Sequence, residues 1–454
     1  MVRCPIHERD DAPAVLIVGG GLGGLLLGIL LESINVPYHI FERATEVRPP
    51  GTVIRAGPDI LAVLEQLGLL QEFKAVSVPC PALNFYNTDM NKIGVADQSS
   101  HKQIYGYNSL LLARPRLYNI LLKHIPPSRI SFGKRVLRTE EQCGKVNIFC
   151  SDGTSYEGDI LVGADGASSS VRQSLYKRME EKGRLPKSDT EKSTVTYVSV
   201  VGVANITDTD KFPQARDPFS HFSQVIGKDS RSWGVFSVAD NQVCWSLSRQ
   251  LNQTQAKEQQ FRSSERGLES NRAMLKEFRD LPCPWGGEMG DMIDATPPRF
   301  ISKVLLEEKL FKTWYHGRTV LLGSACHKIV NGAGLGAVKA MQDAVVLANC
   351  IYNMKDTRIE SISTAFQDYY KERYHRADMQ FRQSGMITKA ISLKTWPERV
   401  VRRVFTNFVP NWIHQKAYTK NFEYRPQVVW LALVPNRGTS KVLPQTRRSS
   451  RRNH

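Results

Sequence analysis

Three glycines near the start of the chain have the spacing of a nucleotide-binding turn. Gly19, Gly21 and Gly24 form a G-x-G-x-x-G pattern. In such a turn the first glycine bends the chain, the second lets backbone approach a pyrophosphate, and the third lets a helix pack on a strand. Glu42 ends the next apolar run, where a carboxylate can accept hydrogen bonds from a ribose. The pattern predicts a dinucleotide site, against the alternative of a tight turn without a ligand.

The elements that must position these residues can be read on both sides of the turn. Residues 14–18 form a short apolar run of strand composition, residues 22–32 have a helical pattern, and residues 38–41 form a second apolar run. A helix that begins directly after the turn directs free N–H groups and the positive end of its dipole toward phosphates. Strand, turn, helix and acid in this order favour the dinucleotide site more strongly than the glycines alone.

Two further strand–turn–helix units follow later in the chain. An apolar run at 159–162 leads into G-A-D-G-A-S-S-S-V-R, which places Asp165 at the carboxyl end of a strand. A run at 319–322 leads into a glycine-rich loop at 323–337 and then into a helical pattern. Ligands of open α/β sheets bind at the carboxyl ends of strands, whereas Asp165 could also be a simple helix cap. The three distant units are explained together if they hold one extended ligand.

Between the second and third units the pattern changes to short alternating runs, which predict an antiparallel sheet and a second domain. The runs are residues 195–205, 221–226, 232–238 and 242–249. Trp233, Phe236 and Trp245 could line a substrate surface, although packing between strands is the more common use of such residues.

Composition excludes several classes of protein. No stretch of the 454 residues approaches the roughly 18 uninterrupted apolar residues of a membrane-spanning helix. The eight cysteines show no metal-binding spacing, which together with a nucleotide-binding start favours a reducing compartment, and we expect a cytoplasmic protein. No triad-like arrangement of nucleophile and base is present, and His327 is interpreted as a loop-packing residue rather than a base.

The formal net charge is +17, and part of it lies in a basic tail. No nucleic-acid-binding signature accompanies the charge, so we expect no nucleic-acid partner. Residues 397–412 form a basic amphipathic pattern that predicts either docking on the body of the protein or, together with the tail, peripheral contact with a membrane. The oligomeric state is left open.

Taken together, the three units resemble the motifs of the class A flavoproteins, the FAD-dependent monooxygenases of the aromatic-hydroxylase type, and most closely their fungal secondary-metabolism members. V-G-G-G-L-G-G-L with Glu42 resembles the FAD fingerprint of that family, G-A-D-G-A-S-S-S-V-R its D-G motif, and G-R-T-V-L-L-G-S-A-C-H-K its third motif. The resemblance covers roughly residues 14–350. It implies an α/β fold: a Rossmann-like FAD-binding domain with a second, antiparallel-sheet substrate domain and C-terminal helices.

The resemblance also implies how the chain is divided. The predicted FAD-binding domain comprises residues 1–80, 113–185 and 299–355, the substrate domain residues 81–112 and 190–298, the C-terminal helical region residues 356–435, and the basic tail residues 436–454.

Roles for residues of the first two motifs follow from the same resemblance. Glu42 would bind the adenosine ribose, and Arg114 would contact the FAD phosphate or ribityl chain. Asp165 would support the pyrophosphate region and the pyridine nucleotide. Arg55 aligns with a backbone position near the cofactor.

The third motif departs from the family pattern. Ser324 stands where aspartate usually reaches the ribityl chain, Asn331 replaces a proline, and Leu335 replaces the glutamine of a G-Q-G element. A serine can still hydrogen-bond a hydroxyl, but without the roughly twofold gain of a charged acceptor. The backbone predicted to pass near the isoalloxazine ring belongs to Gly334, Gly336 and Ala337.

The activity implied by the resemblance is a monooxygenation. NAD(P)H would bind transiently and reduce FAD, and O2 would then give a flavin hydroperoxide that hydroxylates or epoxidises an apolar aromatic or alkene-containing small molecule. The hard chemistry belongs to the cofactor, which accounts for the missing nucleophile and base. Two alternatives stay open, a flavin-binding protein with impaired turnover through its altered third motif, and an oxidase or halogenase. The W-x-W-x-I-P motif of halogenases is absent from the sequence.

Overall fold

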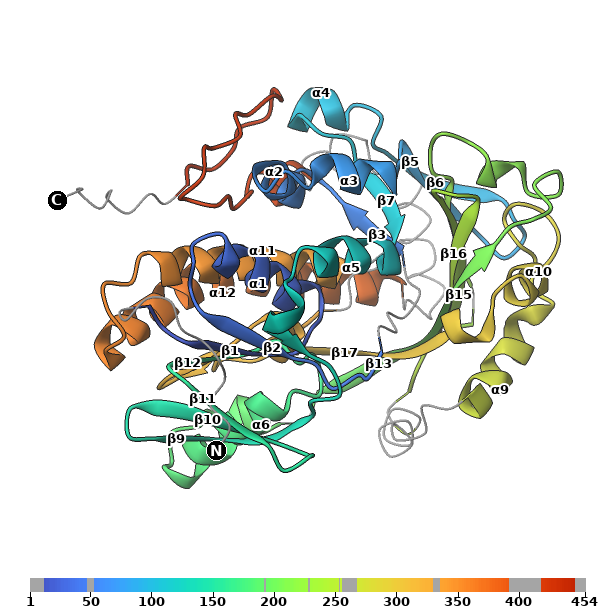
Figure 1. Cartoon of the computed structure of the whole chain (residues 1–454). Coiled ribbons are helices and arrows are strands. Elements are labelled where there is room, and N and C mark those ends of the chain that lie inside the picture. The colour runs from blue at the N-terminus through green and yellow to red at the C-terminus, as the bar shows by residue number, and fades with distance from the viewer. Residues whose placement is uncertain are drawn as a thin grey trace.

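In the computed structural model, the glycine turn follows a strand of a six-stranded sheet (Figure 1). In spatial order its strands are β18 (Tyr315–His316), β19 (Thr319–Leu321), β12 (Ile160–Gly163), β1 (Val15–Val18), β2 (Tyr38–Phe41) and β8 (Ile130–Ser131). β1 runs parallel to both of its neighbours, β12 and β2. Every residue of these three strands is buried, as expected of parallel strands that are covered on both faces.

The structure describes residues 12–46, 53–191, 193–227, 229–252, 254, 268–329, 335–391 and 418–445. The predicted amphipathic segment 397–412 and the tail from residue 446 lie outside this part of the chain, so membrane contact through them stays a prediction. Among the helices that are described, none is long and apolar enough to cross a bilayer.

Helices and a small sheet cover the two faces of the six-stranded sheet (Figure 1). One face carries α1 (Leu22–Glu32), α5 (Arg114–Lys123) and α11 (Leu335–Tyr352), with α12 (Ile359–Ile391) packed on α11. The other carries α6 (Ser170–Glu181) and the antiparallel strands β9 (Val136–Gln142), β10 (Lys145–Cys150) and β11 (Ser155–Gly158). α1 approaches α11 closely because Gly23 has no side chain; a Cβ there would lie 3.1 Å from Ala340 Cβ.

An eight-stranded sheet forms the second layer, as predicted from the alternating runs. In spatial order it comprises β20 (His327–Lys328), β17 (Ser302–Leu310), β13 (Thr194–Asn205), β16 (Gln242–Gln250), β15 (Arg231–Val238), β14 (Phe222–Ile226), β5 (Ala82–Tyr86) and β6 (Lys92–Asp97). β17 pairs with β13 in this sheet, although residue 299 onward was assigned to the cofactor domain. The domain boundaries themselves stay a prediction.

Two tryptophans of this sheet are structural rather than substrate-lining. Trp233 and Trp245 are each 1 % exposed and pack with α9 (Leu268–Arg279) and α10 (Met289–Asp294). Trp233 Nε1 donates to Pro282 O at 2.9 Å, and Trp245 Nε1 to Thr296 Oγ1 at 2.8 Å. Of the two roles left open for these residues, packing is the correct one.

The opposite face of the eight-stranded sheet meets a three-stranded sheet. This sheet consists of β3 (Val53–Ala56), β7 (Leu110–Ala113) and β4 (Val78–Pro79). Along the chain, α2 (Pro58–Gln66) and α3 (Leu70–Ala75) lie between β3 and β4, and α4 (His101–Tyr105) precedes β7. Val53, Leu83, Leu111, Phe222 and Phe236 form the apolar contact between the two sheets.

In two stretches the secondary structure departs from the local sequence pattern. Residues 104–112 have the composition of a single strand, but α4 ends at Tyr105, Gly106 takes φ +83°, and β7 begins only at Leu110. The helix is held by distant partners, since Arg425 Nη1 donates to Tyr105 O at 2.8 Å. Residues 130–132 have the alternating pattern of an antiparallel strand, whereas β8 joins β2 in parallel.

Residues 418–445 form a C-terminal strap over α2 and α4 that contains little regular structure (Figure 1). The side-chain amide of Gln66 donates to Val428 O at 3.1 Å and accepts from Val428 N at 2.8 Å. Arg437 pairs with Glu65 through both guanidinium nitrogens. The end of the described chain is therefore part of the folded body.

Candidate cofactor and active site

Three consecutive backbone hydrogen bonds join the three predicted motifs. Gly19 N–H donates to Phe41 O, Ala164 N–H to Val18 O, and Leu322 N–H to Gly163 O, at 2.8, 2.8 and 3.0 Å. Each bond lies at the carboxyl end of neighbouring strands, β2, β1, β12 and β19 in that order. The glycine turn, the D-G motif and the third motif therefore share one edge of the six-stranded sheet.

The three glycines of the first turn differ in what surrounds them. Gly19 has φ +111°, and a Cβ there would lie 2.4 Å from Ala164 O. A Cβ on Gly24 would lie 2.1 Å from Gly19 O, whereas a Cβ on Gly21 would meet nothing within 4 Å. Gly19 and Gly24 are thus required by the packing of the chain itself. Gly21 borders open space, as a backbone that receives a ligand must.

Glu42 is held against this turn at the end of β2. Its Oε2 accepts from Gly20 N–H at 2.7 Å and its Oε1 from Ala44 N–H at 2.8 Å. These bonds orient the carboxylate and leave further lone pairs on both oxygens for other donors. The arrangement suits a residue that must present acceptors to ribose hydroxyls in one direction.

Arg114, at the first turn of α5, and Glu42 each lie close enough to Tyr118 to affect its charge. Both charges act on Tyr118: burial raises the pKa of its phenol to about 12, with Glu42 adding to the rise and Arg114 opposing it. Burial also lowers the pKa of the Arg114 guanidinium. Its Nε is buried and has no hydrogen-bond partner among the described residues. An anion would satisfy this group.

The two carboxylate oxygens of Asp165, in the D-G motif, have different surroundings. Its Oδ2 accepts from Ser170 N–H at 2.7 Å and Val171 N–H at 3.3 Å, which caps the start of α6. Its Oδ1 is buried without a partner in the described part of the chain. The capping role weighed from the sequence is therefore real, and it leaves one oxygen unused.

Arg55 lies on β3, opposite Leu111 of β7. Its guanidinium carbon lies 5.8 Å from the centre of the Tyr418 ring, and its Nη1 is a third buried polar atom without a described partner. Arg55, Arg114 and Asp165 are all residues assigned to FAD from the sequence. Their orphaned atoms are what one expects of a site shaped for a polar, anionic group, so the residues present fit FAD.

Ser324 lies in the short 3₁₀ turn η5 (Gly323–Ala325), directly after β19. Its hydroxyl makes no hydrogen bond with a described residue. Gly336 and Ala337 form the first turn of α11, and a Cβ on Gly336 would meet nothing within 4 Å. Gly334 lies outside the described residues, so its predicted role stays a prediction.

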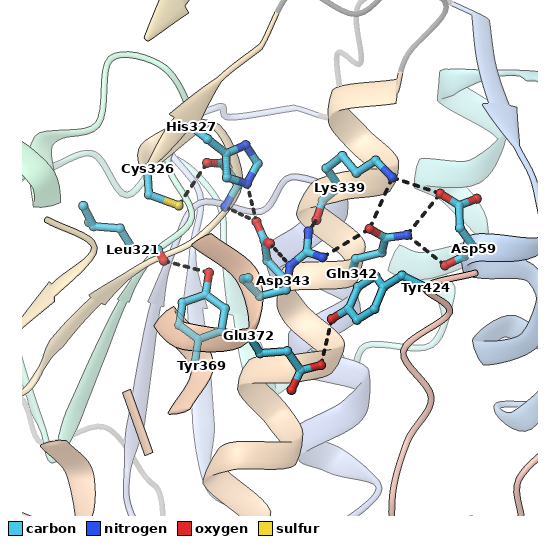
Figure 2. Close-up of polar contacts among 12 residues, drawn as sticks. Asp59, Leu321, Cys326, His327, Lys339, Gln342, Asp343, Tyr369, Glu372 and Tyr424 are labelled. Carbon is cyan, nitrogen blue, oxygen red and sulfur yellow. Dashed lines mark hydrogen bonds and ion pairs between the residues drawn. The ribbon is translucent and has the colours of Figure 1, made fainter. Parts of the chain in front are cut away.

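A buried ionic network behind the third motif was missed by sequence reasoning. Asp343 accepts from Gly323 N–H at 3.0 Å and lies 2.6 Å from both His327 Nε2 and Arg373 Nε (Figure 2). The available signal was an aspartate within the apolar pattern of residues 337–352. His327 is buried and held by Asp343, in agreement with a packing role.

The network continues toward β3 and α2. Lys339 Nζ donates to Asp59 Oδ2 at 3.1 Å, and Gln342 Nε2 donates to the same oxygen at 3.0 Å (Figure 2). Burial lowers the pKa of Lys339, with the charge of Asp59 opposing the effect. Arg373 Nη1 reaches Gln342 Oε1 at 3.4 Å, which joins the two halves of the network.

Cys326, His327 and Asp343 could also be considered as metal ligands, since their potential ligand atoms lie within 4.8 Å of one another. Cys326 Sγ, however, donates to Gly323 O at 3.3 Å. Both oxygens of Asp343 already accept hydrogen bonds from described residues. Hydrogen bonding therefore accounts for the cluster without a metal ion.

The first two motifs also belong to a known protein family. A family model described as FAD binding domain matches residues 12–276, which is more than half of the chain. The chain belongs to this FAD-binding family. The matched part contains the glycine turn and the D-G motif, while the third motif lies beyond it.

Similar curated proteins of the family are FAD-dependent monooxygenases. ptmM of Penicillium ochrochloron is 28% identical over 400 residues, covering 84% of this chain and 89% of that protein. paxM of Penicillium paxilli is 29% identical over 389 residues, covering 83% and 78%. This family membership makes the chain an FAD-dependent monooxygenase.

The fold agrees with that of solved structures. HpxO of Klebsiella pneumoniae, solved with FAD and uric acid, superposes with a TM-score of 0.73 at 19% identity and covers 91% of this chain and 97% of its own. The expected fold, with its FAD-binding α/β domain, second sheet and C-terminal helices, is confirmed.

Proposed function

We propose that the chain binds FAD along the shared sheet edge and uses NAD(P)H and O2 to hydroxylate or epoxidise an apolar aromatic or alkene-containing small molecule. The observation that carries the proposal is the convergence of three motifs on one edge, with unpartnered polar atoms on Arg55, Arg114 and Asp165. When bound, FAD supplies hydride acceptance from NAD(P)H and activation of O2 for transfer of one oxygen atom.

The residues of the chain divide the work of holding the cofactor. Glu42, fixed by Gly20 and Ala44, presents acceptors to the adenosine ribose. Arg114 supplies a positive charge for the diphosphate, and its burial strengthens that attraction because the local dielectric is low. Asp165 Oδ1 accepts from a hydroxyl or from the pyridine nucleotide. Ser324 hydrogen-bonds the ribityl chain, and Gly336 and Ala337 let the backbone of α11 approach the ring.

The substrate would lie against the eight-stranded sheet, whose many apolar residues favour an apolar substrate. Apolar surroundings would also exclude water. An oxygen-transferring site needs this exclusion, because otherwise the activated oxygen is lost as hydrogen peroxide. NAD(P)H would bind transiently, since the chain has one glycine fingerprint and FAD occupies it.

The test is purification followed by spectroscopy and turnover. We expect a yellow protein whose flavin is bleached by NADPH without oxygen, and NADPH oxidation that rises when the correct apolar compound is added. Reaction under ¹⁸O₂ should place one labelled atom in the product. Flavin that is retained but neither reduced nor coupled to product would instead favour a flavin-binding protein without turnover, an alternative that the comparisons do not support.

A further inference from the structure

Among the residues that the structure describes, the most deeply buried charges lie behind the third motif rather than in it. Asp343 of α11 is 0 % exposed, and Arg373 of α12 is 1 % exposed. A charged pair that is removed from water is costly unless its geometry is good and its remaining lone pairs are satisfied. Asp343 meets that condition, because Gly323, His327 and Arg373 all contact its two oxygens (Figure 2).

Two of these three partners belong to the third motif. Gly323 begins η5, and His327 begins β20, so the carboxylate holds both ends of segment 323–327. Gly323 has φ +63°, and a Cβ there would lie 2.7 Å from Ala340 Cβ of α11. The segment therefore packs closely against α11 at Gly323, and at His327 it is bound to the Asp343 carboxylate of the same helix.

Ser324 lies between these two attachments. Its own hydroxyl contributes nothing to holding the loop among the described residues, so its position is set by its neighbours. The same carboxylate belongs to α11, whose first turn contains Gly336 and Ala337. Asp343 thus determines how the two parts of the third cofactor-binding segment lie relative to each other.

We infer that Asp343 is the positioning residue of the third cofactor-binding segment, and that Arg373 holds its carboxylate charged and correctly oriented. The inference rests on the proposed function, because it requires segment 323–327 and the first turn of α11 to contact FAD. Asp343 does not itself touch the cofactor; it acts through Gly323, His327 and the helix on which it lies.

The electrostatics agree with a carboxylate that stays ionised. Burial alone would raise the pKa of Asp343, but the charge of Arg373 and the hydrogen bonds from His327 and Arg373 oppose it, and its pKa lies below the usual range. Arg373 in turn contacts the ring of Tyr424 and Gln342 Oε1, which restricts its guanidinium. The pair therefore provides a rigid connection between α11 and α12.

The experiment compares FAD affinity with the stability of the apoprotein. We expect Asp343→Asn and Arg373→Met each to weaken FAD binding at least tenfold and to alter the visible spectrum of the flavin that remains bound. The double variant should be no worse than the poorer single variant, because either change alone breaks the same connection. Affinity is measured by quenching of flavin fluorescence on the apoprotein, and stability by thermal unfolding of the apoprotein.

Asn349→Leu is the matched control on the same helix. Asn349 binds the C-terminal strap, donating to Gln427 O at 2.9 Å and accepting from Val429 N–H at 3.1 Å, far along α11 from its first turn. This variant should lower the unfolding temperature of the apoprotein and leave FAD affinity and spectrum within twofold of the original.

Several outcomes would overturn the inference. Wild-type affinity and spectrum in Asp343→Asn would do so, as would affinity losses no larger than Asn349→Leu shows at the same loss of stability. Should Asp343→Asn not fold, Arg373→Lys keeps the charge but not the Nε contact, and unchanged FAD binding in that variant would also contradict the role. A wild-type chain that binds no FAD would overturn the cofactor site itself, which separates the two failures.

Discussion

At the scale of single residues, some glycines of the turn are required by the packing of the chain and others by the predicted ligand. Gly24 packs against the backbone of Gly19, whereas Gly21 borders open space. The sequence pattern predicts these two functions, approach to a pyrophosphate for Gly21 and helix packing for Gly24. Substitution by alanine tests them separately.

Gly24→Ala should destabilise the protein by about 1–3 kcal/mol through overpacking, and FAD binding should fall with stability. Gly21→Ala should cost no more than about 1 kcal/mol, as expected of a lost glycine N-cap, yet weaken FAD binding at least tenfold. Thermal unfolding of the apoprotein and FAD titration measure the two effects. Equal FAD affinity in Gly21→Ala and the wild type would mean that no pyrophosphate lies against this backbone.

Arg114 gives a prediction with opposite signs for stability and binding. Removing a partly buried cation that has no counterion among the described residues should leave the apoprotein as stable or make it more stable. Arg114→Met should therefore keep or raise the unfolding temperature of the apoprotein while weakening FAD binding at least tenfold. Arg114→Lys keeps a charge but loses the several N–H donors of the guanidinium. Its FAD affinity should therefore lie between those of the wild type and Arg114→Met. A loss of stability without a loss of affinity would contradict the assignment.

Ser324 tests the departure of the third motif from the family pattern. A carboxylate at this position would accept a charge-assisted hydrogen bond from a ribityl hydroxyl, roughly twice as strong as a neutral one. Ser324→Asp should thus tighten FAD binding several-fold, and Ser324→Ala should loosen it by a similar factor. Unchanged dissociation constants in both variants would show that residue 324 does not reach the ribityl chain.

At the scale of elements, α4 and the strap depend on a buried histidine. His101 is 3 % exposed, packs against Tyr105, Tyr418 and Phe422, and has its pKa lowered to about 4, first by burial and then by the charge of Arg55. The unfolded chain binds this proton near pH 6.5, and the folded chain does not until about pH 4. Stability should therefore fall as the pH drops through this window.

For His101 the loss between pH 7 and pH 5 should be about 2 kcal/mol. His39 of β2, whose pKa is also lowered to about 4, should add a similar slope. His101→Asn can keep a contact with Ser109 Oγ, which His101 Nδ1 makes at 3.0 Å, but it cannot titrate. Urea unfolding at pH 7, 6 and 5 should show a flatter pH dependence in this variant. An identical slope would mean that the pKa of His101 does not differ between the folded and the unfolded chain.

Element prediction succeeded where the signal was local. The strand, turn and helix around Gly19 agree with the structure because glycine spacing and helical periodicity are properties of neighbouring residues. α4 and β8 do not follow their local sequence patterns because distant residues decide them: Arg425 holds the end of α4, and β2 offers the edge that β8 joins.

At the scale of the whole molecule, the strap joins the C-terminal part of the chain to the cofactor domain. Phe422 and Val428 are buried in it, and each is worth about 1.5–3 kcal/mol of apolar burial. A chain that ends after residue 417 should therefore lose at least about 3 kcal/mol of stability. A chain that ends after residue 445 keeps the strap and should unfold at the wild-type temperature, as thermal denaturation can establish. Equal stability of both truncations would contradict the structural role of the strap.

The sequence by itself determined the three strand–turn–helix units, the second sheet and the residue types suited to a dinucleotide, because these depend on spacing along the chain. Only the tertiary structure decided that β2, β1, β12 and β19 lie side by side, which places their turns on one edge. It also decided that Asp343 meets Arg373, since that contact joins two helices. Pairing between distant segments depends on which surfaces meet when the chain packs, and no local pattern records it.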